Sequence, residues 1–156
     1  SLLSDYVRTL IEDSQGHLFI GSLTGLQKYD RATDSFTTIP MYLSSGVPIA
    51  PNVGVILEQN NGEILIGTSG HSIFLVETQE DSIKAQQIDQ FIASNLITYS
   101  YRDRKGNLWI ATGDNGIFRL DNNNQFKHYS GEKSIAWNTV SSMCEDKQVN
   151  LYMGSL

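Results

Sequence analysis

The chain has 156 residues, a formal net charge of −6, a hydrophobic share of 40% and a charged share of 18%. This length suits about one domain, the apolar content is sufficient for a buried core, and the charged share is too low for a disordered tail. The acidic balance excludes a basic face for nucleic-acid backbones, and no apolar run approaches the roughly 20 residues that span a bilayer. We therefore expect no nucleic-acid partner and no membrane insertion by this segment.

Four similar segments follow one another along the chain, starting at Ile11, Leu57, Tyr101 and Cys144. Each places a bulky residue at the same point of a predicted strand, spaced 46, 44 and 43 residues apart: Phe19, Leu65, Trp109 and Tyr152. A turn glycine recurs in the same register as Gly16, Gly62 and Gly106, with Val149 as the fourth equivalent. Matches in register at four positions indicate an internal repeat.

Each repeat is predicted to form short strands joined by tight turns. In the first repeat the strands cover residues 6–12, 17–22, 26–30 and 35–39, and in the third they cover 97–102, 107–111, 116–120 and 125–129. Four strands per unit of about 44 residues is the period of a β-propeller blade. The predicted fold is all-β: one partial propeller over residues 1–156, an incomplete arc of about 3.5 blades. The approximate blades are residues 5–49, 50–93, 94–136 and a half blade at 137–156.

Acidic residues recur at the turn between the first two strands of the repeats, as Glu12, Asp13, Asp103, Glu145 and Asp146. We expect them to support the turn by accepting backbone hydrogen bonds rather than to act as an acid–base pair. The single cysteine, Cys144, excludes an intrachain disulfide. Its place in an apolar strand predicts a small buried hydrophobic residue.

No catalytic or metal-binding pattern accompanies the repeats. His17, His71 and His128 occupy different positions in different repeats, and no HExxH, GxSxG, GxGxxG or phosphate-loop motif occurs. We expect no catalytic residue, no metal and no cofactor, so this segment is predicted not to be an enzyme.

Ligand-binding residues are predicted on one face of the propeller. Blade loops alternate between two faces, and the face with the links between blades has the longer and more variable loops, as functional loops tend to be. The candidates there are Met41, Tyr42, His71, Asp114, Asn115 and Trp137. Their aromatic rings offer apolar faces to a ligand, and their amide and carboxylate groups offer hydrogen bonds. Tyr42 and Trp137 also fit a purely structural role in holding the links between blades.

The repeat resembles the two-component-regulator propeller repeat, in which an acidic turn is followed by Gly-Asn-Leu-Trp-Ile-Gly-Thr and an aromatic-Asp pair. The third segment, RDRKGNLWIATGDNGIFRLD, is the best match, through Asp103, Gly106, Asn107, Leu108, Trp109, Ile110, Thr112 and Gly116. The second departs from the pattern at Gln59 and Leu65, and the fourth at Val149. The resemblance covers essentially the whole chain.

The resemblance implies a ligand-sensing region of a hybrid two-component sensor histidine kinase of Bacteroides-type bacteria. It implies a periplasmic location, an oligosaccharide ligand and control of polysaccharide-utilisation genes. An open arc also leaves bare blade faces, so we expect as partners further blades of the parent chain or a second copy in a homodimer. Two alternatives remain: a structural or dimerisation propeller with no ligand of its own, and a propeller lyase. The scattered histidines oppose the lyase.

Overall fold

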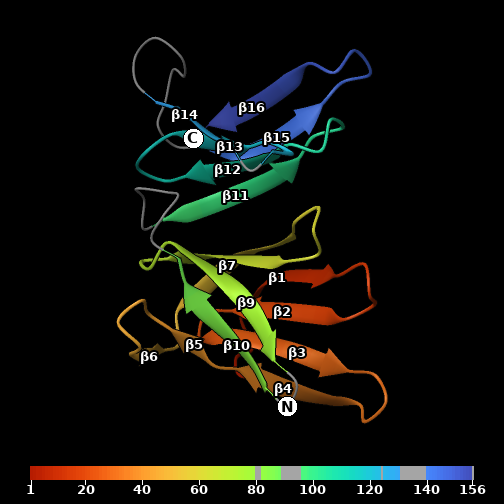
Figure 1. The fold of residues 1–156 in the computed structure, drawn as a ribbon, viewed down its shortest axis with the longest axis vertical. Helices are drawn as coiled ribbons and strands as arrows, with labels where there is room; N and C mark the ends of the chain where they lie inside the picture. The colour runs from red at the N-terminus through yellow and green to blue at the C-terminus, as the bar shows by residue number, and fades with distance from the viewer. Residues whose placement is uncertain (80–81, 89–95, 124, 131–139, 156) are drawn as a thin grey trace.

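The computed structural model describes residues 1–79, 82–88, 96–123, 125–130 and 140–155. In these ranges every regular element is a β-strand, and the strands form four separate sheets, which confirms the all-β prediction. Figure 1 shows the sheets following one another from the N-terminal sheet at the bottom to the last strand pair at the top. In the described ranges no helix is long and apolar enough to cross a membrane.

The first and third sheets each have four antiparallel strands in sequence order. The first has the order β1-β2-β3-β4, with β1 at Val7–Glu12, β2 at Leu18–Ser22, β3 at Gly25–Asp30 and β4 at Ser35–Ile39. The third has the order β11-β12-β13-β14, with β11 at Ile97–Arg102, β12 at Leu108–Thr112, β13 at Ile117–Leu120 and β14 at Phe126–Tyr129. This meander is the topology of a propeller blade.

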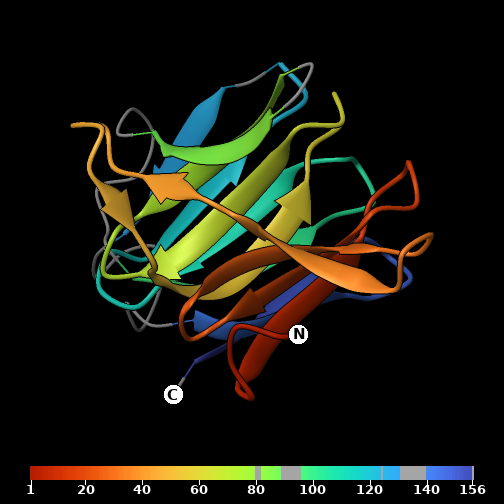
Figure 2. The same ribbon diagram turned by 90° about the horizontal axis from the view of Figure 1, so that it is seen from below.

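The second sheet carries two strands more than the pattern predicts. Its order is β6-β5-β10-β9-β8-β7, with β7 at Asn52–Glu58, β8 at Ile64–Ser69, β9 at Ile73–Gln79 and β10 at Ser82–Gln87. The link after β4 folds into a small hairpin of β5 (Met41–Tyr42) and β6 (Pro48–Ile49). Strand β5 pairs in parallel with β10, so the hairpin extends the second blade at its outer edge (Figure 2).

The fourth sheet is the pair β15 (Val140–Glu145) and β16 (Leu151–Ser155). The first strands of successive blades, β1, β7, β11 and β15, lie against one another in order. In all four blades the register of the first two strands slips by one residue near the start of the first strand, between Val7 and Thr9 in the first blade. The repeat in the sequence is therefore also a repeat in the backbone structure, and it includes this one-residue shift in register.

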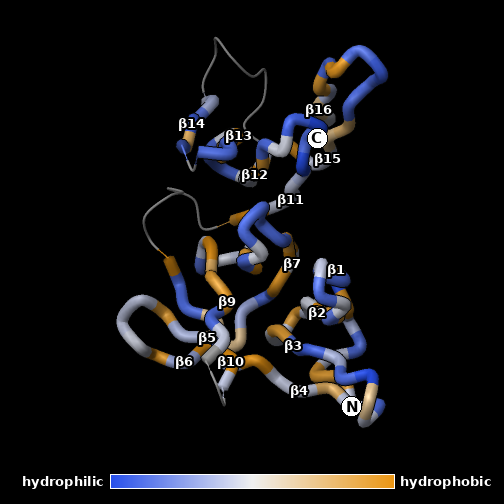
Figure 3. Tube along the Cα trace, turned by 45° about the vertical axis from the view of Figure 1, so that its right-hand side comes forward, coloured by the Kyte–Doolittle hydropathy of each residue, from blue (hydrophilic) through white to orange (hydrophobic). Residues whose placement is uncertain are grey.

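The core lies between the blades, because each sheet alternates side chains that face the preceding and the following blade. Phe19 and Leu26 of the first blade pack with Ile56 and Phe74 of the second. A second cluster joins the second and third blades, and a third joins Trp109 to the fourth. Figure 3 shows apolar stretches along the strands and a hydrophilic turn between β15 and β16.

The burial predicted for Cys144 is wrong, because its thiol is exposed. The strand register aligns Cys144 with Ile11, Leu57 and Tyr101, since each pairs with the bulky residue of its second strand. These three residues pack in the junction with the following blade. Cys144 has the same orientation but no following blade in the described structure, so its side chain faces outward.

The turns between first and second strands share one backbone geometry. Gly16, Gly62 and Gly106 have φ of 82°, 83° and 83°, the left-handed conformation that glycine adopts without steric cost. Val149 occupies the same position with φ of 68°. A β-branched residue is strained there, because its Cβ approaches the following carbonyl oxygen.

Candidate functional site

The candidate site lies on the face where second strands connect to third strands. We call it the loop face: residues 23–24, 69–72 and 113–116, the turn of the β5–β6 hairpin at residues 43–47, and Leu96. The opposite side carries the turns between first and second strands at residues 13–16, 59–62, 103–106 and 146–149, and we call it the turn face. The blade meander alternates its connections between these two faces.

In the first three blades, a buried hydroxyl at the end of the second strand holds the adjoining loop in place. Its oxygen donates to a carbonyl in the loop: Ser22 Oγ to Gly25 O at 3.2 Å, Thr68 Oγ1 to Ser72 O at 2.9 Å, and Thr112 Oγ1 to Gly116 O at 2.9 Å. The three hydroxyl residues are only 3%, 0% and 0% exposed. Buried hydrogen bonds of this kind give the loops a defined shape, which presents their outer side chains without a large ordering cost.

Two glutamines tie the β5–β6 hairpin to the loop face of the second blade. Gln87 Nε2 donates to His71 O at 2.8 Å, and its Oε1 accepts from Ser44 N at 3.2 Å. Gln86 Nε2 donates to Leu43 O at 2.7 Å. The hairpin and the His71 loop are therefore parts of one surface, although about thirty residues separate them in sequence.

Leu96 connects this surface to the third blade. It forms an isolated antiparallel bridge with Ser69, and its carbonyl accepts a hydrogen bond from Gly113 N at 2.9 Å. Leu96 therefore contacts both the loop that contains His71 and the loop that contains Asp114. A continuous track runs from the hairpin through His71 and Leu96 to Asp114.

Four of the six predicted residues lie on or beside this track. Tyr42 and His71 are half-buried and Asp114 is exposed. Asn115 is half-buried, with its N–H donated to Thr112 Oγ1 at 2.9 Å and its carbonyl accepting from His128 Nε2 at 2.8 Å. The structure therefore brings side chains from two blades to one surface.

The other two predicted residues do not contribute to that surface. Met41 is 1% exposed and packs in the core between the first and second blades, because the hairpin folds it inward against β10. We therefore leave it out of the candidate site. Trp137 lies outside the described residues.

A hollow of about 430 Å³ lies along the first strands of three blades. Arg8, Gly54, Thr98 and Ser100 are among its lining residues. None of the three histidines lines it, although all three belong to the described residues. The arrangement supplies one cation and hydroxyl groups at the blades' inner edge, with no acid–base pair.

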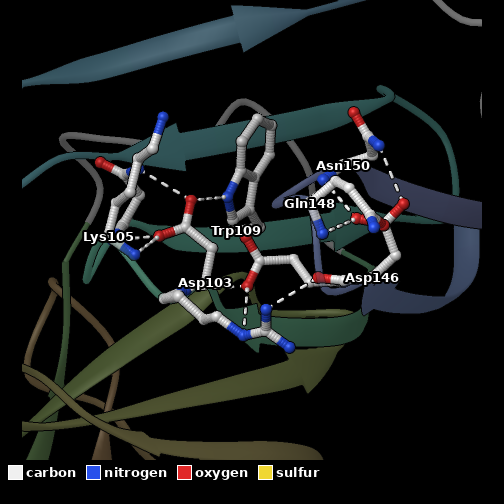
Figure 4. Close-up of polar contacts among 9 residues, drawn as sticks. Asp103, Lys105, Trp109, Asp146, Gln148 and Asn150 are labelled. Carbon is white, nitrogen blue, oxygen red and sulfur yellow. Dashed lines mark hydrogen bonds and ion pairs between the residues drawn. The ribbon is translucent and has the colours of Figure 1, made fainter.

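The turn face carries a carboxylate network centred on Asp103 (Figure 4). Asp103 Oδ1 accepts from Lys105 N at 3.0 Å and Asn107 N at 2.8 Å, and Oδ2 accepts from Asn107 Nδ2 at 2.7 Å and Trp109 Nε1 at 2.8 Å. Burial alone would raise the pKa of Asp103, but the hydrogen bonds from Trp109, Asn107 and Lys105 outweigh it and hold the pKa below its usual value. The ionised carboxylate is therefore part of the folded turn.

Equivalent aspartates organise two other turns, which confirms the prediction of turn chemistry for Asp13, Asp103 and Asp146. Asp13 accepts from His17 N at 2.7 Å and pairs with His17 Nδ1 at 3.0 Å. Asp146 accepts from Asn150 Nδ2 at 2.8 Å, and this contact, seen in Figure 4, is the main reason its pKa is lowered. In the described part of the chain no three His, Cys, Asp or Glu residues gather as metal ligands.

The fold defined by these blades is an incomplete β-propeller, and comparisons with known proteins agree. Residues 1–24 and 92–114 match the family model described as two component regulator propeller. These segments are therefore two-component-regulator propeller repeats, as the sequence resemblance predicted. No curated protein matches the chain in sequence.

Solved structures share the fold at low sequence identity. One is described as the extracellular domain of the hybrid two component system BT4673 from B. thetaiotaomicron, with 19% identity and a TM-score of 0.78 over 99% of this chain and 22% of that one. The extracellular domain of BT3049 from the same organism has 20% identity and a TM-score of 0.55, over 99% of this chain and 26% of that one. The chain thus spans about a quarter or less of these domains.

Propellers with a different role share the architecture too. The catalytically inactive H270A form of virginiamycin B lyase from Staphylococcus aureus has 13% identity and a TM-score of 0.64, over 99% of this chain and 51% of that one. At such identities the likeness establishes the fold alone.

Several features that build the loop face were missed by sequence reasoning. The repeat register contained a signal for the hydroxyl residues, because Ser22, Thr68 and Thr112 all follow the small residue at the end of the second strand. The β5–β6 hairpin and its glutamine ties had no such signal, since in the described ranges they occur in one blade alone.

Proposed function

We propose that this chain is part of the extracytoplasmic ligand-sensing region of a hybrid two-component sensor histidine kinase. The observation that carries the proposal is the two-component-regulator propeller repeat on a fold shared with extracellular domains of hybrid two component systems. In this proposal the segment lies in the periplasm, binds a ligand without transforming it, and passes the signal to a kinase elsewhere in the parent protein.

The proposed ligand is an oligosaccharide, and the proposed output is control of polysaccharide-utilisation genes. The support comes from the loop face, where the hairpin that carries Tyr42 is tied to the His71 loop, and Leu96 joins that loop to the one that carries Asp114. An aromatic side chain with nearby carboxylate and amide groups is suited to the two kinds of surface that a sugar ring presents. The buried hydroxyls of Ser22, Thr68 and Thr112 hold the loops by hydrogen bonds, which favours a preformed site.

Isothermal titration calorimetry tests this proposal. The 156-residue chain and the full sensor region of its parent are titrated with malto-, xylo-, fructo- and uronate-containing oligosaccharides. We expect one of these classes to bind, with Asp114→Asn weakening binding about tenfold, an effect of roughly 1.4 kcal/mol. Glu63→Gln, the same chemical change on an exposed residue directly after the turn at residues 59–62, is the matched control and leaves binding unchanged. If no oligosaccharide binds to either protein, the glycan proposal is wrong.

A second function, association through the ends of the arc, is supported by the exposure of apolar side chains there. Leu10 on the first blade is 59% exposed, and Tyr152 on the fourth is 56% exposed. In this proposal the partners are further blades of the parent chain or a second copy. Substitution of these residues would then dissociate the assembly while sugar binding by a dissociated chain remains.

Catalysis is not proposed for this segment, although one propeller of similar fold is a lyase. His17 is engaged by Asp13 in a turn, and the ring of His128 stacks on Phe118 with 4.2 Å between ring centroids. His71 lies on the loop face of the second blade, whereas His17 belongs to the first blade and His128 to the third. Turnover of a candidate substrate that His71→Ala abolishes would restore the enzyme alternative.

A further inference from the structure

A hollow of about 110 Å³ lies on the turn face between the second and third blades, and we call it the junction hollow. Residues 59–61 of the second blade and residues 121–122 of the third line it, together with Arg102. Leu108 and Leu120, which belong to the core between these blades, line it as well. Pockets for drug-sized molecules have about 300 Å³ or more, so the junction hollow has room for one end of a small ligand. Both blades that enclose it are formed by this chain.

Arg102 ends the first strand of the third blade, at a position where the other blades carry an acid. The strand register aligns it with Glu12, Glu58 and Glu145. At the neighbouring junctions this acid joins the blades: Glu58 Oε2 accepts from Ser14 N at 2.9 Å, and Glu145 Oε2 accepts from Arg104 N at 2.9 Å. A cation at this position is therefore not needed to join two blades, so the fold alone does not explain Arg102.

The guanidinium of Arg102 is held in place by neutral oxygens. Nη1 donates to Asn60 Oδ1 at 2.5 Å and to Gly106 O at 3.2 Å, and Nη2 donates to Glu58 O. None of the ion pairs that the structure describes includes Arg102, although its side chain is half-buried. Partly buried charges are usually paired with an opposite charge, so this fixed cation favours an anionic ligand.

Several polar groups in the lining have hydrogen-bonding capacity to spare. Arg102 Nε makes no hydrogen bond to a described residue, and it is not among the buried polar atoms without a partner, so it is open to solvent. Asn61 Nδ2 and Asp121 Oδ2 also make no hydrogen bond to a described residue. A carboxylate can accept from the arginine and amide donors, and a hydroxyl on the same molecule can donate to Asp121.

We propose that the junction hollow binds the carboxylate end of a hydroxy acid, with Arg102 as the residue that binds the anion. The Asp121 carboxylate in the same lining repels a doubly charged anion more than a singly charged one, which favours a carboxylate over a sulfate. Two sources share this chemistry, a free hydroxy acid and a uronate residue of a glycan. The site lies on the turn face, so it does not rest on the oligosaccharide site proposed for the loop face.

Titration of the ¹⁵N-labelled 156-residue chain, followed by NMR, tests the site. The ligands are galacturonate, the neutral sugar galactose, and sulfate. We expect galacturonate to shift the Gly106 amide and Arg102 Nε signals and to bind about tenfold or more tightly than galactose, because only galacturonate presents a carboxylate to the guanidinium. Added NaCl should weaken the binding of galacturonate, since it screens the attraction between the charges.

Two variants in the lining should weaken galacturonate binding about tenfold. Arg102→Gln removes the cation, but Arg102 also joins two blades, so a second variant keeps that contact intact. Asn61→Asp places a carboxylate in the lining, while its Oδ1 can still accept from Glu63 N and preserve the turn. It should weaken galacturonate binding without weakening galactose binding. Gln15→Glu makes the same chemical change at the equivalent exposed turn position of the first blade, and it should leave binding unchanged.

The proposal is overturned if none of these ligands shifts the Gly106 and Arg102 signals. Equal affinities for galacturonate and galactose, or for galacturonate and sulfate, overturn the assignment of a carboxylate ligand. Shifts confined to the loops at His71 and Asp114 place the ligand on the loop face, which overturns the turn-face site and leaves the proposed oligosaccharide site standing. Gluconate and the methyl glycoside of galacturonate distinguish the two sources. Tighter binding of gluconate supports a free hydroxy acid, and tighter binding of the glycoside supports a uronate residue of a glycan.

Discussion

Replacing Val149 by glycine is expected to stabilise the last blade. Val149 has φ of 68°, whereas the three residues at the same turn position are glycines with φ of 82° to 83°. A β-branched residue in the left-handed region pays about 1–2 kcal/mol in steric strain. The side chain is 41% exposed and belongs to none of the buried clusters that the structure describes, so its loss removes little packing.

The expected gain follows from two opposing terms. Glycine relieves the strain of about 1–2 kcal/mol, but it also increases the freedom of the unfolded chain by about 0.5–1 kcal/mol. The Val149→Gly variant should therefore be more stable by about 0.5–1 kcal/mol. For a chain of this size that corresponds to a rise in Tm of about 2 °C.

The second blade offers the reverse substitution. Gly62 has φ of 83°, and a Cβ built on it would meet no heavy atom within 4 Å. Gly62→Val therefore introduces the strain without a clash, and it should destabilise the chain by about 0.5–1 kcal/mol. Gln148→Gly is the control, because this turn residue is not in the left-handed region and gains only unfolded-state freedom.

Urea unfolding followed by tryptophan fluorescence measures these changes, since Trp109 packs at the junction with the last blade. Hydrogen exchange of the β15 and β16 amides detects the same change locally, because a terminal blade can open by itself. Destabilisation of Val149→Gly by as much as Gln148→Gly would refute the strain argument. An unchanged stability of Gly62→Val would refute it as well.

Two further predictions concern the buried polar groups. Asp103→Asn replaces an acceptor of the Trp109 N–H by a donor and should cost about 2 kcal/mol at pH 7 in urea unfolding. Because the folded-state pKa of Asp103 is lowered, its carboxylate stabilises the fold above the unfolded-state pKa of about 3.9 and stops doing so as the pH falls through the folded-state value. The difference between wild type and variant should therefore shrink below about pH 4, and a constant difference would contradict this role. Thr112→Val removes a fully buried hydroxyl that donates to Gly116 O, and it should lower the free energy of unfolding by about 1–2 kcal/mol. Hydrogen exchange of the amides in the loop at Asp114 should become faster. Unchanged exchange would mean that the hydroxyl does not hold the loop.

The repeat made the blades predictable from sequence alone. Alternating apolar residues define strands, and Asp103 with Gly106 defines the turn between two of them, because both signals depend only on neighbouring residues. The aspartate networks follow from the same register, since the partners of Asp103 lie within six residues of it. These features needed no knowledge of which blades touch.

The site residues were predictable only as positions on a face. The sequence places Tyr42, His71 and Asp114 in connections on the same face. It gives no indication of the bridge at Leu96 or the tie at Gln87, which bring those connections together. Met41 was predicted to lie in the site, but it lies in the core. An apolar residue in a link between blades was expected at the surface, and the parallel pairing of β5 with β10 buries it.

Cys144 marks the division between what the sequence by itself determined and what only the tertiary structure decided. Its strand, its register and the face of the sheet on which it lies all follow from the repeat. Its exposure does not, because burial of a blade face requires a neighbouring blade, and the alternation of side chains along a strand is the same with or without one. Local chemistry thus determines the blade, while packing between blades determines which of its surfaces remain available for binding.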